Sequence, residues 1–245
     1  MQRVVLTIAK NAPLTPLIYE MQLVGDVSGV ERAGQFVEIA LEGLYLRRPI
    51  SVCNFEEGRL TIIYKVVGKG TDLMSQMAEG TELDVLTGLG NGFDIDHECQ
   101  RPLLVGGGVG VPPLYRLTRD LVAKGREVTV ILGFNTESEI FYKEEFESLG
   151  AKVIVATADG SVGVKGFVTD AIRESGVEYD YFYSCGPLPM LKALCEATTT
   201  SGEVSLEERM GCGFGVCMGC SIQTASGAKR VCKDGPVFKK EEVLW

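Results

Sequence analysis

The chain has 245 residues, of which 45% are hydrophobic, enough for one large core or for two modest cores with an appendage. Its net charge of −9, without a basic run, argues against a nucleic acid or an anionic membrane surface as partner. No segment reaches the roughly 18 to 20 apolar residues of a membrane span, and the N-terminus lacks the pattern of a secretory signal, so we expect a cytoplasmic protein.

Short strands separated by turn residues are predicted over residues 1–98. Each is apolar or alternating, with Pro, Gly, Asp or Asn between most of them. The predicted strands are residues 4–9, 18–23, 35–40, 50–53, 60–65 and 82–86. Strands at this spacing indicate a small closed antiparallel β-barrel. A short helix over residues 72–77, with Thr71 as its N-cap, is expected to interrupt it.

Strands and helices then alternate, which is typical of a doubly wound parallel sheet. The predicted strands are 103–105, 127–132, 152–156 and 181–184, and the predicted helices are 112–123, 143–148, 167–174 and 187–197. Beyond about residue 203 the periodicity fades. We therefore expect three units: a β-barrel (1–98), an α/β domain (99–202) and a C-terminal segment (203–245).

Four of the eight cysteines gather in the C-terminal segment. They follow the spacing C-x4-C-x2-C-x11-C in a glycine-rich stretch, as Cys212, Cys217, Cys220 and Cys232. The first three match the plant-type ferredoxin run, in which four thiolates hold a [2Fe-2S] centre, and glycines let backbone N–H groups point at the sulfurs. Zinc sites usually pair their cysteines in two short hairpins, and a reducing compartment disfavours disulfides. An iron–sulfur cluster is favoured, with zinc as the alternative.

The remaining cysteines are scattered, and we expect them to be small buried hydrophobic residues. They are Cys53, Cys99, Cys185 and Cys195. The single histidine, His97, lies in an acidic stretch and is expected to be solvated. One imidazole excludes a Rieske-type histidine pair and an HExxH zinc site. Bound redox cofactors are therefore expected to supply the chemistry.

A glycine-rich turn follows the predicted strand at residues 103–105. Its glycines would let the backbone approach a pyrophosphate, and the helix that begins at Pro112 offers free N–H groups. These glycines are Gly106, Gly107, Gly108 and Gly110. The turn departs from the G-x-G-x-x-G fingerprint, because Pro113 occupies the place of the third glycine. Alone, it is equally compatible with an ordinary strand-to-helix turn.

Two further motifs lie in the predicted barrel. The run Arg47-Arg48-Pro49-Ile50-Ser51 places a guanidinium at the mouth of a strand, and alternation turns Arg48 and Ile50 to one side and Ser51 to the other unless Pro49 bends the strand. The run Gly68-Lys69-Gly70-Thr71 precedes the short helix. Each motif alone is no more than a surface arginine or a turn.

Together these features resemble the ferredoxin-NADP reductase superfamily. The barrel carries R-P-x-S and G-x-G-T, and the α/β domain opens with G-G-G-x-G-x-x-P and closes with Cys185-Gly186-Pro187. The four-cysteine loop narrows the resemblance, which covers essentially the whole chain, to the electron-transfer subunits of B-type dihydroorotate dehydrogenases. Two departures are Thr87, where that family usually has proline, and the short gap before Cys232.

The resemblance implies three cofactor sites and no catalytic residue in the acid-base sense. Arg48 would pair with the FAD pyrophosphate and Ser51 would lie near the flavin ring. The implied FAD contacts are Arg48, Pro49, Ile50, Ser51, Ile63, Tyr64, Lys65, Gly70 and Thr71. The implied NAD contacts are Gly106, Gly107, Gly108, Gly110, Cys185, Gly186 and Pro187. The cluster ligands are Cys212, Cys217, Cys220 and Cys232. NAD is favoured over NADP, because residues 135–139 carry acids where a 2′-phosphate binder has arginine.

In that family's reaction, which belongs to pyrimidine biosynthesis, a separate FMN-containing catalytic subunit oxidises dihydroorotate, and electrons pass through the cluster and FAD to NAD. A (β/α)8 barrel needs roughly 250 residues of its own, so this chain implies a partner subunit, for which the cysteine loop is the expected docking face. The resemblance suggests two copies of each subunit. The alternatives are a subunit of a related NAD(P)H:ferredoxin or sulfide-linked oxidoreductase, and a non-catalytic metal-binding regulator.

Overall fold

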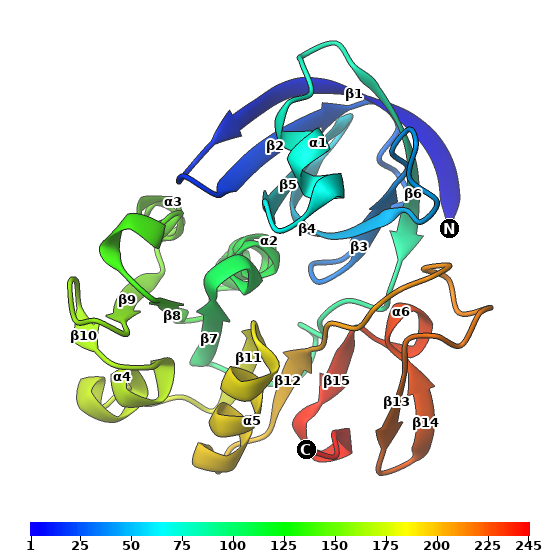
Figure 1. Ribbon diagram of the computed structural model, residues 1–245. Coiled ribbons are helices and arrows are strands. Elements are labelled where there is room, and N and C mark those ends of the chain that lie inside the picture. Colours follow the sequence, from blue (N-terminus) through cyan, green and yellow to red (C-terminus); the bar gives the residue numbers. More distant parts are fainter.

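The computed structural model describes all 245 residues. Its N-terminal part is a closed antiparallel barrel with the strand order β1-β2-β5-β4-β3-β6 (Figure 1), so the predicted barrel is confirmed. The strands are β1 (Gln2–Pro13), β2 (Ile18–Val24), β3 (Phe36–Ile39), β4 (Arg48–Glu56), β5 (Arg59–Lys65) and β6 (Glu82–Leu89). Alternate side chains, among them Leu6, Met21 and Ile62, fill the barrel interior.

The short helix of the barrel is α1 (Lys69–Ser75), and the prediction that Thr71 caps it is wrong. Gly68 is the N-cap, and Thr71 is the third residue of the helix. From there its hydroxyl accepts hydrogen bonds from the N–H groups of Val67 (3.0 Å) and Gly68 (3.3 Å). Thr71 therefore satisfies the backbone N–H groups before the helix, as a capping residue would, although it lies inside the first turn.

The second unit is a seven-stranded sheet with the order β10-β9-β8-β7-β11-β12-β15. Its strands are β7 (Pro102–Gly107), β8 (Thr129–Phe134), β9 (Lys152–Thr157), β10 (Val164–Lys165), β11 (Tyr181–Cys185), β12 (Gly202–Ser205) and β15 (Val237–Lys239). All pairings are parallel except that of β15, which runs antiparallel to β12. The predicted doubly wound sheet is therefore confirmed.

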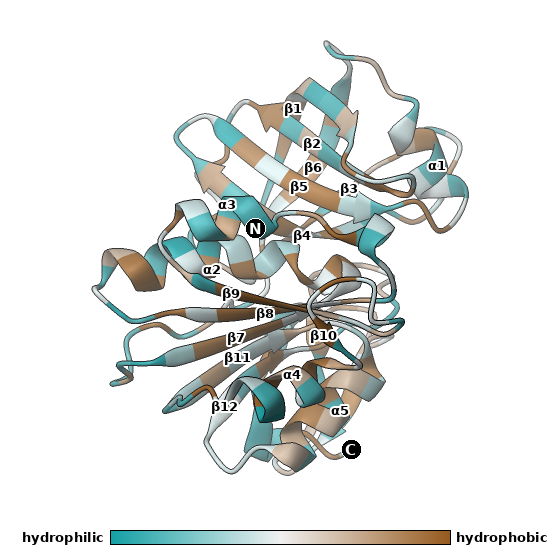
Figure 2. Cartoon of the chain, turned by 90° about the vertical axis from the view of Figure 1, so that its left-hand side faces the viewer, coloured by the Kyte–Doolittle hydropathy of each residue, from teal (hydrophilic) through white to brown (hydrophobic).

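Helices cover both faces of the sheet. The helices α2 (Pro112–Ala123) and α3 (Lys143–Ser148) lie on the face towards the barrel, whereas α4 (Val168–Ser175) and α5 (Leu188–Ala197) lie on the opposite face (Figure 1). Figure 2 shows hydrophobic residues along the strands between these layers. Strand β7 is accordingly buried over its whole length. No helix has the length and apolar character needed to cross a bilayer.

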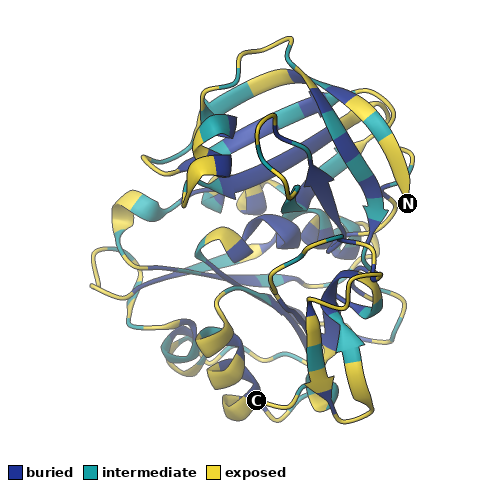
Figure 3. Cartoon of the chain, turned by 45° about the vertical axis from the view of Figure 1, so that its right-hand side comes forward, coloured by how far each residue is buried: buried dark blue, intermediate teal, exposed yellow.

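The C-terminal segment contains short elements that the sequence pattern did not predict. Its hairpin pairs β13 (Ser221–Thr224) with β14 (Gly227–Arg230) and is largely exposed (Figure 3). The helix α6 (Val231–Asp234) leads on to β15. There Asn91, from the end of the barrel, donates to the carbonyl of Val237 (2.8 Å) and accepts from its N–H (3.1 Å). The segment therefore lies at the junction of barrel and sheet.

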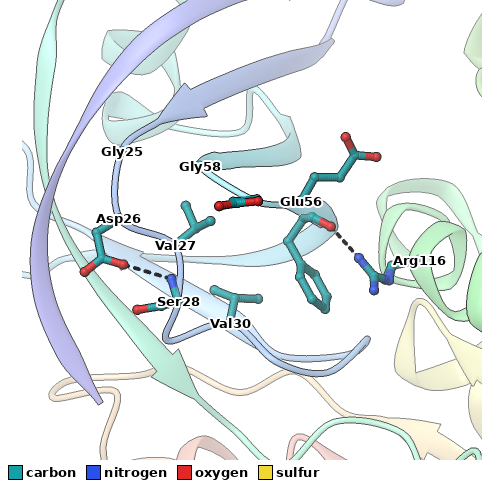
Figure 4. A pocket seen from close by; sticks show the side chains of 10 residues that line it. Gly25, Asp26, Val27, Ser28, Val30, Glu56, Gly58 and Arg116 are labelled. Atoms are coloured by element: carbon teal, nitrogen blue, oxygen red, sulfur yellow. Dashed lines mark hydrogen bonds between the residues drawn. The ribbon is translucent and has the colours of Figure 1, made fainter.

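The barrel and the α/β domain share one hydrophobic core. Ile18, Cys53 and Ile63 of the barrel belong to the same buried cluster as residues of α2 and α3. At its edge the Tyr142 hydroxyl donates to the buried Glu20 carboxylate at 2.9 Å. Beside it, Arg116 of α2 donates to the Phe55 carbonyl, and its guanidinium carbon lies 3.8 Å from the centre of the Phe55 ring (Figure 4).

His97 is not the solvated loop residue that the acidic surroundings indicated. Its ring lies 3.9 Å from that of Tyr181, centre to centre, and its Nε2 atom is 3.3 Å from the Tyr183 hydroxyl. Tyr183 also donates to the carbonyl of Asp94 at 2.8 Å. The reason is tertiary, because the strand that carries both tyrosines lies far away in the sequence. His97 thus helps to fix the link between the two domains.

Removing the Tyr142 hydroxyl tests how firmly the domains are tied. The variant Tyr142→Phe deprives the buried Glu20 carboxylate of a donor, and we expect the free energy of unfolding at pH 7 to fall by about 1 to 3 kcal/mol in urea denaturation. Burial raises the pKa of Glu20, but hydrogen bonds from Lys10, Tyr142 and Gln22 outweigh it and hold the pKa below its usual 4.5. The stabilisation that the ionised Glu20 carboxylate gives to the folded state is therefore present above pH 4.5 and is lost as the pH falls through the folded-state pKa.

The control variant is Tyr45→Phe, since the Tyr45 side chain is fully exposed. We expect it to unfold like the wild type. If Tyr142→Phe is equally stable at pH 7, its hydroxyl does not hold the domains together.

Candidate cofactor cleft and cysteine loop

The glycine-rich turn and the Cys185-Gly186-Pro187 segment lie side by side at the carboxyl edge of the sheet. Cys185 pairs with Gly106 across the parallel strands β11 and β7. A Cβ atom added at Gly110 would lie only 2.3 Å from the Cys185 carbonyl oxygen, so the two segments touch through their backbones. From β7 the chain extends the sheet to one side, through β8, β9 and β10, and from β11 it extends the sheet to the other side, through β12. Ligands of doubly wound sheets bind in the crevice at this reversal.

Arg48 and Gly70 also come together, although they belong to different motifs. A Cβ atom at Gly70 would lie 2.2 Å from the Arg48 Nε atom, so the guanidinium crosses directly over the start of α1. Arg48 donates to the carbonyl of Leu46 at 2.6 Å. Along β4, Ile50 packs against the barrel core and Cys53 lies in the core shared by the two domains, but the register shifts between Val52 and Asn54, so the alternation does not continue through the strand.

The three residues expected from β5 have different surroundings. Ile63 is buried in the shared core, and Lys65 is half-buried. Tyr64 packs in the barrel core instead, where its hydroxyl donates to Asn11 at 2.9 Å. The Tyr64 ring therefore faces away from the domain junction, and only its backbone is free to meet a ligand there. Thr71 is similar, since its hydroxyl is already engaged in the α1 turn.

A cleft of about 510 Å³ opens between the two domains. Its walls come from the barrel, from the start of α5 and from the segment before Cys212: Leu46, Arg47, Arg48, Pro49, Gly186, Leu188, Leu191, Glu207, Glu208, Arg209 and Met210. Sequence reasoning assigned no role to residues 207–210, and only their position just before the cysteine loop hinted at one. A second groove, of about 410 Å³, lies beside Arg116 and contains none of the expected site residues (Figure 4).

The four cysteines of the C-terminal loop lie as two pairs. The backbone N–H of Cys217 donates to the Cys212 sulfur, and that of Cys232 donates to the Cys220 sulfur. The second pair is buried, whereas Cys212 is half-exposed and Cys217 exposed. The structure does not bring three or more His, Cys, Asp or Glu side chains together at one point. Two thiol pairs suit a binuclear cluster held by four thiolates.

Backbone N–H groups point at the sulfurs, as a cluster loop requires. The Cys212 sulfur accepts from Val216 (3.3 Å) and Cys217 (3.4 Å), and the Cys220 sulfur accepts from Cys232 (3.4 Å). Burial raises the pKa of Cys212, but these N–H groups and that of Phe214 outweigh it and bring the pKa to about 6. The fold thus favours the thiolate, the form that binds metal, at Cys212, whereas burial raises the pKa of Cys232 to about 12.

A buried carboxylate that sequence reasoning missed lies against this loop. Glu38 of β3 is 1% exposed, and its Oε1 atom has no hydrogen-bond partner. A Cβ atom at Gly213 would lie 2.4 Å from that oxygen. Burial raises the pKa of Glu38 to about 7, although Arg47 acts in the opposite direction. No sequence signal marks Glu38, because the contact joins β3 to a loop far along the chain.

Acidic residues follow the sheet strands β8 and β9 at the same carboxyl edge. Asn135 donates to Glu139 at 2.8 Å, and the Glu137 N–H donates to the Ser161 hydroxyl at 2.8 Å. Ser161 in turn donates to Asp159 at 2.7 Å. The two segments therefore form one acidic rim, of which the sequence indicated only residues 135–139.

Comparison with known proteins agrees with this arrangement. Residues 207–244 match the family model of the iron-sulfur cluster binding domain of dihydroorotate dehydrogenase B, and residues 104–196 match the oxidoreductase NAD-binding domain. A chain of the solved NADH-dependent reduced ferredoxin-NADP oxidoreductase superposes with a TM-score of 0.91 at 33% identity, covering 99% of this chain and 90% of that one. The fold and its sites define an NAD-linked iron–sulfur oxidoreductase subunit of the ferredoxin reductase type.

The curated relatives are more specific. The chain is 46% identical to the dihydroorotate dehydrogenase B (NAD(+)) electron transfer subunit of Bacillus pumilus (strain SAFR-032), over 99% of this chain and 98% of that protein. It is 46% identical to the subunit of the same name from Geobacillus sp. (strain WCH70), over 98% and 97%. The chain belongs to the family of dihydroorotate dehydrogenase B electron transfer subunits, so the resemblance predicted from its motifs is confirmed.

The contact between Gly110 and Cys185 can be tested by adding one methyl group. The variant Gly110→Ala forces the glycine-rich turn away from β11, and we expect it to lower the free energy of unfolding by about 1 to 3 kcal/mol, measured by thermal or urea denaturation. The control is Gly68→Ala, since a Cβ atom there meets nothing within 4 Å and the backbone is extended. Equal losses in both variants would contradict the close approach.

Proposed function

We propose that this chain carries electrons between a partner FMN-containing dihydroorotate dehydrogenase subunit and NAD, through a [2Fe-2S] cluster and FAD. One observation carries the proposal. The interdomain cleft is lined by Arg48 of the barrel, Gly186 of the α/β domain and Met210, which is two residues before Cys212. A flavin and a nicotinamide that met in this cleft would therefore lie next to the cluster loop.

The barrel side of the cleft is the proposed FAD site. Arg48 offers a planar guanidinium to the pyrophosphate, and the close approach of Gly70 brings backbone N–H groups of α1 to the same place. When bound, a flavin exchanges electron pairs with a nicotinamide and single electrons with a cluster. The remaining contacts proposed from the family motif are Pro49, Ile50, Ser51, Ile63, the Tyr64 backbone, Lys65 and Thr71.

The carboxyl edge of the sheet is the proposed NAD site. The turn from Gly106 to Gly110, with Gly107 and Gly108, leaves room for the pyrophosphate, and Cys185, Gly186 and Pro187 border the nicotinamide position. Burial raises the pKa of Cys185 to about 12, so its thiol stays neutral at this position. The acidic rim beyond β8 and β9 repels a 2′-phosphate, which supports NAD rather than NADP.

The cysteine loop is the proposed cluster site and docking face. Cys212, Cys217, Cys220 and Cys232 supply the four thiolates. Between them Val216 and Met218 are 74% and 53% exposed, and Phe214 is 38% exposed. Exposed apolar side chains around a redox centre suit contact with a second protein. We propose that the FMN-containing subunit docks here, in an assembly with two copies of each subunit.

The residues of this chain form a closed barrel, a seven-stranded sheet and a C-terminal segment, and none of them forms a (β/α)8 barrel. We therefore place the oxidation of dihydroorotate outside these three parts. The expected three-unit division at residues 98 and 202 stays a prediction, and both β12 and β15 pair within the sheet. The cytoplasmic location stays a prediction.

The second candidate is a subunit of a related NAD(P)H:ferredoxin oxidoreductase. It is favoured by the high structural similarity to the NADH-dependent reduced ferredoxin-NADP oxidoreductase, but identity to that chain is 33%, against 46% for the dihydroorotate dehydrogenase B subunits. Co-expression distinguishes the two. The chain should co-purify with an FMN-bearing dihydroorotate dehydrogenase subunit and confer NAD reduction on it, and failure of both would favour the second candidate.

Arg48 is the residue that best tests the FAD site. The variant Arg48→Ala loses a charge-assisted hydrogen bond to phosphate, and we expect FAD affinity to fall by about 1 to 3 kcal/mol. The readout is the ratio of flavin absorbance to protein after gel filtration. The matched control is Arg59→Ala, an arginine of the neighbouring strand β5 that contacts Gln22 instead. Unchanged flavin content in Arg48→Ala would remove the proposed role.

Cys220 tests whether the cluster lies on the electron path. The variant Cys220→Ser should abolish electron delivery between the chain and its partner, while direct reduction of FAD by NADH remains measurable in a stopped-flow experiment. The control is Cys195→Ser, which alters a buried cysteine of α5 outside the loop. Full partner activity in Cys220→Ser would mean that the cluster is off the path.

A further inference from the structure

Arg230 joins the two parts of the chain that carry the four cysteines. It is the last residue of β14 and precedes Cys232 by two residues. Its Nη1 atom donates to the carbonyl of Gly215 at 2.9 Å, and Gly215 precedes Cys217 by two residues. One side chain thus connects the exposed end of the loop to the segment of the fourth cysteine.

Asp234 holds this guanidinium in place from the other side. Arg230 donates through Nε to Oδ2 at 3.0 Å and through Nη2 to Oδ1 at 3.2 Å, and its backbone N–H donates to Oδ2 at 2.8 Å. Both side chains are about three-quarters buried, with 25% and 31% of their surface exposed. This is the forked arginine–carboxylate geometry, which a lysine cannot reproduce.

The pair also lies within electrostatic range of the sulfurs. Arg230 and Asp234 flank Cys232 at two residues on either side, the Val231 N–H donates to the Cys220 carbonyl at 3.0 Å, and the Cys232 N–H donates to the Cys220 sulfur at 3.4 Å. Arginine remains charged at any relevant pH. A cation and an anion are therefore both fixed beside the buried thiol pair, in a partly desolvated position where salt screens them incompletely.

We propose that Arg230 and Asp234 form a clamp that closes the cysteine loop and sets the reduction potential of the cluster, an inference that rests on the proposed function. Reduction adds one electron to the cluster and makes or breaks no bond. The added negative charge is stabilised by Arg230 and opposed by Asp234, because cluster potentials follow the local charge and hydrogen bonding. The two residues are positioning residues with opposite effects on one equilibrium.

The experiment is a potentiometric titration of the full chain with its FAD and cluster, monitored by the EPR signal of the reduced cluster. Arg230→Gln should lower the midpoint potential and Asp234→Asn should raise it, each by a three- to tenfold change in the one-electron equilibrium, or about 30 to 60 mV. The double variant should return towards the wild type. Shifts in the same direction, or no shift in either single variant, would overturn the electrostatic role.

Iron release to a chelator tests the clamp separately. Arg230→Lys keeps the charge but loses the fork, so we expect it to release iron at least several-fold faster than the wild type. The control is Lys233→Gln, which removes an exposed cation packed on Gly215 that forms no ion pair in the structure, and which should release iron at the wild-type rate. Equal rates in Arg230→Lys and wild type would overturn the clamp.

The two proposals fail in different ways. If Arg230→Gln cannot retain a cluster, that loss supports the clamp, and the direction of the shift in Asp234→Asn decides the electrostatic role. A wild-type chain that shows no [2Fe-2S] signal would defeat the proposed function itself. A wild-type signal with unshifted and equally stable variants would defeat only this inference.

Discussion

The shared core between barrel and α/β domain is the constraint on which the sites depend. A cleft between two domains keeps its shape only if the domains are held together, and here Ile18 and Ile63 of the barrel are packed in one buried cluster with Leu114 of α2. Interiors of this kind resist displacement because they are close-packed. The Tyr142 bond to Glu20 lies at the edge of that cluster, one strand from β5. The relative position of Arg48 and Gly186 is thereby set before any cofactor binds.

The C-terminal segment depends on the same rigid frame. A cluster loop rich in glycine has little core of its own, and its hairpin is mostly exposed. It is held instead by β15, which pairs with β12 of the sheet, and by Asn91, which bonds both backbone groups of Val237. Glu38 of the barrel packs against Gly213 from the other side. Both domains therefore position the loop.

The sequence was sufficient for whatever has a local cause. Hydrophobic periodicity predicted the barrel and the parallel sheet, and residue spacing predicted the cysteine loop. What it missed is decided by partners far along the chain: β15 forms because β12 offers it an edge, and His97 is half-buried because Tyr181 reaches it. Likewise, alternation alone could not tell which face of β5 meets the barrel core, where the Tyr64 ring packs.

The unequal burial of the two thiol pairs distinguishes an exposed side and a buried side of the proposed cluster site. Cys220 and Cys232 are 2% exposed and lie among the hydrophobic residues packed under β12, whereas Cys217 is open to solvent between exposed apolar neighbours. The two pairs would hold the cluster from different surroundings, Cys220 and Cys232 from the hydrophobic interior and Cys212 and Cys217 from the solvent side. Since electron transfer requires short separations, the proposed partner would approach the loop from the side of Cys217, while Cys212, two residues from the cleft residue Met210, connects the loop to the cleft.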